Sequence, residues 1–164
     1  YGGVGSGKTH AAIHVLLRFF EARQESVSYI TVYQFLDYRR RYLDDRFSDD
    51  KAAKARASQQ FSHQRKLLKE CALLVLDELG QEKLAPDESK VLFDILYGRY
   101  SANKLTICIS NHCDDAKRSL GDRRLTALVG ERIGSRLKAA EQVYFSGPDL
   151  RMQEGRDLAR GSGR

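Results

Sequence analysis

The sequence is poor in cysteine and lacks any long apolar run. Its three cysteines, Cys71, Cys108 and Cys113, follow no paired spacing that would indicate a metal site. Cys71 and Cys108 border or lie inside expected strands, so we expect small buried thiols rather than a disulfide or a zinc site. No segment reaches the length of a membrane span, and the sequence contains no signal-like segment and no internal repeat. These absences favour a cytoplasmic globular protein.

The composition fits one globular core. Of 164 residues, 41% are hydrophobic and 30% are charged, which is enough for one sizeable core and leaves little for a second. Lysine and arginine number 28 against 22 aspartates and glutamates, so the formal net charge is +6. This excess mildly favours polyanionic partners, although charge alone identifies none of them.

Residues 2–9 read GGVGSGKT and fit the pattern GxxxxGK[ST] of a phosphate-binding loop. Glycine allows backbone N–H groups to approach phosphates closely, Lys8 would reach the outer phosphate oxygens, and Thr9 would meet Mg²⁺. The expected nucleotide contacts are Gly3, Val4, Gly5, Ser6, Gly7, Lys8, Thr9 and His10. Such a loop joins a buried strand to a helix, and only Tyr1 precedes it here, so we expect the sequence to be a fragment.

An amphipathic helix is expected directly after the loop. Ile13, Leu16, Leu17 and Phe20 recur at the spacing of one helical face and would pack on the core. A glycine-rich turn that binds nothing is the alternative for the loop, but every fixed position of the motif is filled and a helix follows. The pattern therefore predicts a phosphate site at a helix N-terminus.

Two carboxylates follow a second core element. The apolar run 72–76 does not alternate, which is typical of a strand covered on both faces in a parallel sheet, and it ends at Asp77 and Glu78. We assign Asp77 to the Mg²⁺ shell and Glu78 to the general base that polarises water. A third expected strand, 105–110, ends at Asn111, which would orient water near the γ-phosphate; a helix cap or turn is the alternative.

The remaining pattern alternates helices and strands. Expected helices cover 9–24, 33–44, 52–70, 87–101, 114–120 and 122–138, and expected strands cover 27–32, 72–76, 105–110 and 141–145. In the second helix, Phe35, Tyr38 and Tyr42 share one stripe and are expected in the core. Alternation of this kind predicts an α/β fold with a doubly wound parallel sheet.

The motifs in this order resemble a known family. GGVGSGKTH at 2–10, LLVLDELG at 73–80, TICISN at 106–111 and VGERIGSRL at 129–137 are similar to AAA+ ATPases of the DnaC helicase-loader and IstB transposition-helper group. The resemblance implies a three-layer P-loop NTPase with a parallel sheet in the order 5-1-4-3-2, its first strand missing from this fragment, and no helical lid domain. Residues 1–150 would form the ATPase core, and 151–164 a flexible tail.

The resemblance also implies an assembly of subunits in an arc or spiral, with ATP at each junction. Arg132 matches the position of the family's arginine finger, and Arg136 matches the second arginine of that motif. Arginine supplied by a neighbour can stabilise charge on the transferring phosphoryl group. The alternative is that both belong to a solvated basic helix face.

A basic tract occupies the stretch that faces single-stranded DNA in the family. Arg39, Arg40 and Arg41 would grip phosphates there, giving sequence-independent and salt-sensitive binding. The alternative is a solvated face on which nearby aspartates, Asp37, Asp44 and Asp45, pair with these arginines.

The combined expectation is an ATPase with ATP and Mg²⁺ as cofactors that loads a replicative DNA helicase. Its partners would be that helicase, single-stranded DNA and further copies of itself. A transposition helper with a transposase as its partner is the close alternative. A P-loop small-molecule kinase and a nucleotide-gated scaffold without turnover are two others.

Overall fold

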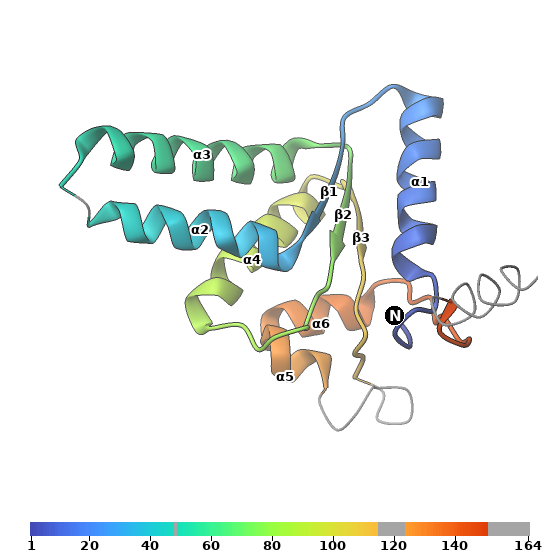
Figure 1. Cartoon of the computed structure of the whole chain (residues 1–164). Coiled ribbons are helices and arrows are strands. Elements are labelled where there is room, and N and C mark those ends of the chain that lie inside the picture. Colours follow the sequence, from blue (N-terminus) through green and yellow to red (C-terminus); the bar gives the residue numbers. More distant parts are fainter. Residues whose placement is uncertain (48, 115–123, 151–164) are drawn as a thin grey trace, which may run out of the picture.

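The structure is a computed structural model and describes residues 1–47, 49–114 and 124–150. Its elements are α1 (Lys8–Arg23), β1 (Val27–Thr31), α2 (Val32–Arg46), α3 (Lys51–Glu70), β2 (Leu73–Asp77), α4 (Pro86–Ser101), β3 (Leu105–Cys108), α5 (Leu125–Val129) and α6 (Glu131–Ala139) (Figure 1). The expected helix at 114–120, apart from its first residue, and the expected tail at 151–164 lie outside the described residues.

The three strands form one parallel sheet in the order β1-β2-β3. In its register, Thr31 pairs with Asp77 and Leu76 pairs with Cys108. Parallel strands end at the same edge of a sheet, so the end of β1, the acidic end of β2 and the chain after β3 lie together there. The observed order is compatible with the expected order 5-1-4-3-2, in which these strands would be the second, third and fourth.

Helices cover both faces of the sheet, which confirms the three-layer α/β fold. α1 lies on one face, and α2, α3 and α4 lie on the other (Figure 1). All five residues of β2 are buried, as expected for a central strand. Leu73 and Val75 pack with α1, whereas Leu74 and Leu76 belong to the larger core cluster with α2, α3 and α4.

The predicted core face of α1 is only partly right. The helix buries Ala12 and Leu16, while Ile13, Leu17 and Phe20 are 38%, 52% and 45% exposed. Ala12 and Leu16 are four residues apart and form one narrow stripe against the sheet. A face inferred from large residues alone misses a small buried residue such as Ala12.

The aromatic stripe of α2 lies in the core, as predicted. Phe35 is fully buried, and Tyr38 and Tyr42 pack against the same cluster. The Tyr42 ring stacks on that of Phe61 in α3, with 5.3 Å between the ring centroids. The stripe therefore joins α2 to α3 rather than offering rings to nucleic-acid bases.

The expected core thiols are confirmed. Cys71 is buried in the larger core cluster and Cys108 packs against it, and Cys113 is buried as well. Burial raises the pKa of the Cys108 thiol to about 12. None of the three cysteines, all of which the structure describes, forms a disulfide.

The chain after β3 differs from expectation in two places. The single helix predicted over 122–138 is two helices, because Gly130 has φ +93° and ψ 153° and interrupts the helix between α5 and α6. The strand predicted over 141–145 is also wrong: among the described residues, only an isolated parallel bridge joins Phe145 to Gly2. The Tyr1 amino group donates to the Val143 carbonyl at 2.8 Å, and the Phe145 amide donates to the Tyr1 carbonyl at 2.8 Å.

Candidate nucleotide-binding site

The phosphate loop adopts the backbone that its glycines permit. Gly5 and Gly7 have φ of +71° and +86°, in the left-handed region that other residues avoid. Gly7 is the N-cap of α1, and as a glycine it has no side chain that could cap the first N–H groups of the helix. The first turn of α1 therefore directs N–H groups and the positive end of its dipole at the loop, which is a favourable setting for an anion.

Lys8 places a buried positive charge inside this loop. Its Nζ donates to the carbonyls of Gly2 at 3.0 Å and Gly3 at 2.5 Å, and it lies 3.3 Å from Ser6 Oγ. The Lys8 residue is only 8% exposed. The loop's own oxygen atoms thus compensate the buried ammonium group.

Three donors hold the Asp77 carboxylate at the end of β2. Thr9 Oγ1 donates to Asp77 Oδ2 at 2.8 Å, and the Tyr29 hydroxyl donates to the same oxygen at 2.9 Å. The Glu78 amide donates to Asp77 Oδ1 at 2.7 Å. Asp77 is 4% exposed, so these bonds replace the water that the carboxylate loses on burial.

Tyr29 was not anticipated from the sequence. Burial, its hydrogen bond to Asp77, and the charges of Asp77 and Glu78 raise its pKa to about 12. The hydroxyl is therefore a donor at neutral pH. No sequence motif marks Tyr29, because it reaches Asp77 only through the pairing of β1 with β2.

Glu78 and Asn111 reach the same place from neighbouring strand ends. Glu78 has φ +59°, an unusual conformation for a residue other than glycine, and its side chain is exposed. Main-chain bonds from Ile109 to Leu76 and from Leu79 to Ile109, both 2.9 Å, keep the chain after β3 against the acidic loop. Asn111 lies two residues after Ile109 and lines the same cavity as Glu78.

One cavity of about 440 Å³ unites these groups. Its predicted lining residues are Val4, Gly5, Ser6, Gly7, Lys8, Thr9, His10, Asp77, Glu78 and Asn111, and those missed are Gln81, Ile109, Ser110 and Leu150. Gly3 contributes its carbonyl to Lys8 but does not line the cavity. Leu150 reaches the loop by donating its amide to the Gly5 carbonyl at 3.1 Å, a contact for which the sequence held no signal.

The oxygen atoms in this cavity suit Mg²⁺. Thr9 Oγ1 and the Asp77 carboxylate are hard ligands that lie within 2.8 Å of each other. Among the described residues, no cluster of three or more histidine, cysteine, aspartate or glutamate side chains could hold a metal alone. A metal at this site would need water and nucleotide phosphates as further ligands, which is the usual arrangement for Mg²⁺.

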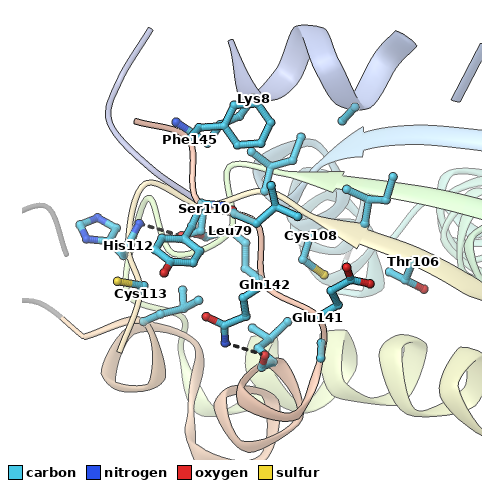
Figure 2. Close-up of a pocket in the computed structure, with 18 of the residues that line it drawn as sticks. Lys8, Leu79, Thr106, Cys108, Ser110, His112, Cys113, Glu141, Gln142 and Phe145 are labelled. Carbon is cyan, nitrogen blue, oxygen red and sulfur yellow. Dashed lines mark hydrogen bonds between the residues drawn. The ribbon is translucent and has the colours of Figure 1, made fainter. Parts of the chain in front are cut away.

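A larger cavity of about 790 Å³ lies beside the site (Figure 2). β3 lines one side of it and residues 140–143 line the other, and Lys8 and Ser110 border both cavities. Thr9, Asp77 and Glu78 do not line it. The charged groups needed for phosphate chemistry therefore lie in the smaller cavity.

The two arginines of α6 do not line the nucleotide cavity of their own chain. The Arg136 guanidinium lies 4.6 Å from the Phe93 ring centroid and 5.1 Å from that of Tyr97, and Arg132 lies 5.8 Å from Phe93. The ring faces of α4 thus support both cations. Arg132 is exposed, whereas Arg136 is half-buried.

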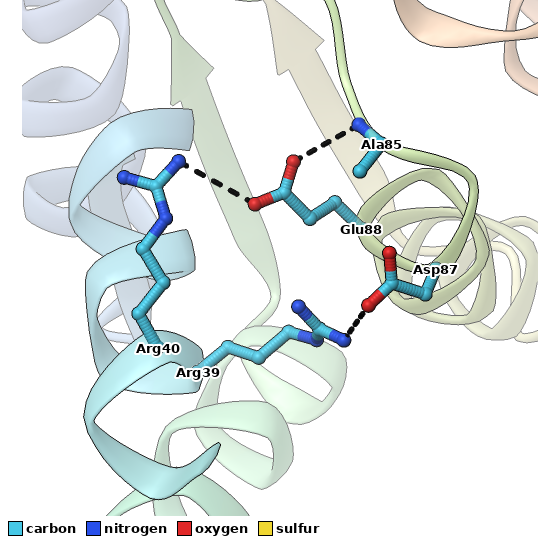
Figure 3. Close-up of polar contacts among 5 residues, drawn as sticks. All are labelled: Arg39, Arg40, Ala85, Asp87 and Glu88. Atoms are coloured by element: carbon cyan, nitrogen blue, oxygen red, sulfur yellow. Dashed lines mark hydrogen bonds and ion pairs between the residues drawn. The ribbon is translucent and has the colours of Figure 1, made fainter. Parts of the chain in front are cut away.

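The three adjacent arginines of α2 that were predicted to contact DNA, Arg39, Arg40 and Arg41, do not line the nucleotide cavity either, and each has a carboxylate partner. Arg39 pairs with Asp87 and Arg40 pairs with Glu88 at 3.4 Å, both at the start of α4 (Figure 3). Arg41 pairs with Asp37 at 2.7 Å within α2. Of these three carboxylate partners, the sequence indicated Asp37 but neither Asp87 nor Glu88.

No helix among the described residues is long enough and apolar enough to cross a membrane.

Solved structures with this fold include DNA-replication proteins. The replication initiator DnaA bound to AMPPCP and single-stranded DNA aligns with a TM-score of 0.67 and 21% identity, covering 90% of this chain and 39% of that chain. AMPPCP-bound DnaA from Aquifex aeolicus aligns with a TM-score of 0.65 and 20% identity, covering 89% and 38%. The DnaC helicase loader aligns with a TM-score of 0.65 and 24% identity, covering 88% and 75%.

These likenesses establish the fold, and the chain spans well under half the length of the DnaA structures. No curated protein sequence matches the chain significantly. Residues 1–157 match the sequence model of a family described as IstB-like ATP binding protein. The chain therefore belongs to the IstB-like ATP binding protein family and carries the AAA+ P-loop ATPase core of that family.

Proposed function

We propose that the protein is an Mg²⁺-dependent ATPase that acts on DNA and uses its nucleotide state to control assembly there. The observation that carries the proposal is the single cavity into which Lys8, Thr9, Asp77, Glu78 and Asn111 converge. Phosphoryl transfer to water needs an anion cradle, a metal site and a base side by side, and this cavity has residues suited to all three.

Each residue has a distinct role in this proposal. The loop amides and Lys8 bind the phosphates, and Thr9 and Asp77 hold Mg²⁺, which when bound neutralises charge on the phosphate oxygens. Glu78 is the general base for the attacking water. Asn111 orients that water from the neighbouring strand end.

The substitution Glu78→Gln tests the proposed chemistry. It removes the base but keeps the size of the side chain, so ATP binding should persist while phosphate release falls by at least about a hundredfold. Binding is measured with a fluorescent ATP analogue and turnover by phosphate release. The control is Glu82→Gln, which removes the same charge from the same exposed loop. Equal turnover in the two variants would remove Glu78 as the base.

DNA contact through Arg39, Arg40 and Arg41 and assembly through Arg132 and Arg136 belong to the same proposal. The α2 arginines are half-buried or exposed on a helix outside the nucleotide cavity, where a phosphate backbone could compete for them. The α6 arginines point to rings of α4 rather than into their own site, which suits a role at a neighbour's nucleotide.

The partner that we propose is a replicative helicase, on the strength of the motif resemblance to helicase loaders. A transposase is the second candidate, and the match of residues 1–157 to the IstB-like family favours it. A pull-down with the full-length protein, with ATP present, separates the two. Capture of a hexameric helicase supports loading, whereas capture of a transposase without helicase would replace loading by transposition.

A further inference from the structure

Tyr29 is the one aromatic side chain that touches the acidic end of β2 with a hydrogen bond in the described part of the chain. Its hydroxyl lies 2.9 Å from Asp77 Oδ2, the oxygen that also accepts the Thr9 hydroxyl at 2.8 Å. The Tyr29 residue is 39% exposed, so its hydroxyl is not forced by burial to bond to Asp77. The bond instead links the edge strand β1 to the group expected to hold the metal.

The donors around Asp77 divide unequally between its two oxygens. A carboxylate oxygen has two lone pairs, and both lone pairs of Oδ2 are used by the hydroxyls of Thr9 and Tyr29. Oδ1 accepts one bond from the Glu78 amide and keeps one lone pair. The Tyr29 bond thus determines which oxygen remains available for a metal ion or for its bound water.

The strand that carries Tyr29 is held firmly in place. Thr31, two residues further on, pairs with Asp77 in the ladder, so the register of β1 is fixed at this point. Thr31 also caps α2: its side chain accepts from the Gln34 amide at 3.1 Å, and the Gln34 side chain accepts from the Thr31 amide at 3.0 Å. A hydroxyl on such a rigid support can fix the orientation of its partner.

We propose that Tyr29 is a positioning residue for Mg²⁺: it holds the Asp77 carboxylate so that Oδ1 stays available to the metal or its water. This inference rests on the proposed Mg²⁺-dependent function. Without the Tyr29 hydroxyl, Oδ2 has a free lone pair and the carboxylate is held by two donors, Thr9 and the Glu78 amide, instead of three. Loss of such a supporting hydrogen bond typically weakens metal binding by about 10- to 100-fold.

The test is the Mg²⁺ requirement for binding of a non-hydrolysable fluorescent ATP analogue to the Tyr29→Phe protein. Half-saturation should need about tenfold more Mg²⁺ than in the wild type. Affinity for the analogue in EDTA should stay within about twofold, because the loop and Lys8 are unchanged. The phenyl ring retains the apolar contacts of Tyr29, and circular dichroism checks that the variant is folded.

The matched control is Tyr100→Phe, which removes a hydroxyl from a residue of α4 that is 71% exposed. It should leave the Mg²⁺ requirement unchanged. An unchanged or lower Mg²⁺ requirement in Tyr29→Phe would overturn the inference, as would equal weakening in Mg²⁺ and in EDTA. A wild-type protein whose nucleotide binding ignores Mg²⁺ would instead overturn the proposed function itself.

Discussion

A single buried arginine, Arg99, joins three segments of the chain around the start of the sheet. Its guanidinium donates to the carbonyls of Leu68 at 2.7 Å and Cys71 at 2.8 Å, to the Leu105 carbonyl, and to Thr106 Oγ1 at 2.9 Å. The residue is fully buried, and its bonds to the Leu68 and Cys71 carbonyls are buried as well. Arg99 therefore holds the end of α3 and the start of β3 in one network.

Replacing Arg99 by methionine should strongly destabilise the fold. The substitution removes the donor from the buried carbonyls of Leu68 and Cys71, and we expect the free energy of unfolding to fall by about 3 kcal/mol or more. Arg99→Lys should cost less, because an ammonium group still donates to some of them. Urea unfolding measures both variants. A loss below about 1 kcal/mol for Arg99→Met would show that the network contributes little.

At the residue scale, the sequence predicted the site residues that belong to one continuous motif or that lie at the end of a recognisable strand. The phosphate loop, Asp77 and Glu78 belong to local patterns whose chemistry can be read directly. Tyr29 and Leu150 belong to none: one depends on strand register and the other on how a distant segment returns to Gly5. Tertiary contacts of this kind leave no periodic signal.

At the scale of elements, the types and order of the long helices and strands were predictable and their interruptions were not. Gly130 lies in a helical pattern, yet its φ of +93° separates α5 from α6. Its φ is one that residues with a Cβ rarely adopt, and a Cβ at Gly130 would also come within 2.7 Å of Ser89 Oγ in α4, so the position favours glycine. The predicted helix continued across it because sequence periodicity carries no information about that approach.

The salt dependence of DNA binding tests the role of α2. Replacing Arg40 and Arg41 together by alanine should weaken binding to single-stranded DNA and lower the slope of log K against log salt by about 0.7 per lost phosphate contact. The control is Arg18→Ala with Arg23→Ala, which removes two charges from the exposed ion pairs of α1. The two double variants should differ in slope. Identical slopes would assign DNA contact to another surface.

At the scale of the whole molecule, the nucleotide cavity is lined by the phosphate loop and by the residues that we propose as metal ligand and base, but by no arginine of α6. Arg132 and Arg136 rest on α4 rings outside the cavity of their own chain. A head-to-tail contact between copies would bring the α6 surface of one chain to the nucleotide of the next. Our central proposal is therefore an ATPase whose active unit is a junction between two copies.

Mixing two inactive variants tests this proposal most directly. A Lys8→Ala chain lacks the phosphate-binding lysine but keeps Arg132, and an Arg132→Ala chain has the reverse defect. In an equal mixture, about a quarter of the junctions combine an intact loop with an intact arginine. Phosphate release should therefore rise clearly above that of either variant alone. A mixture no more active than the two variants measured separately would contradict a site shared between subunits.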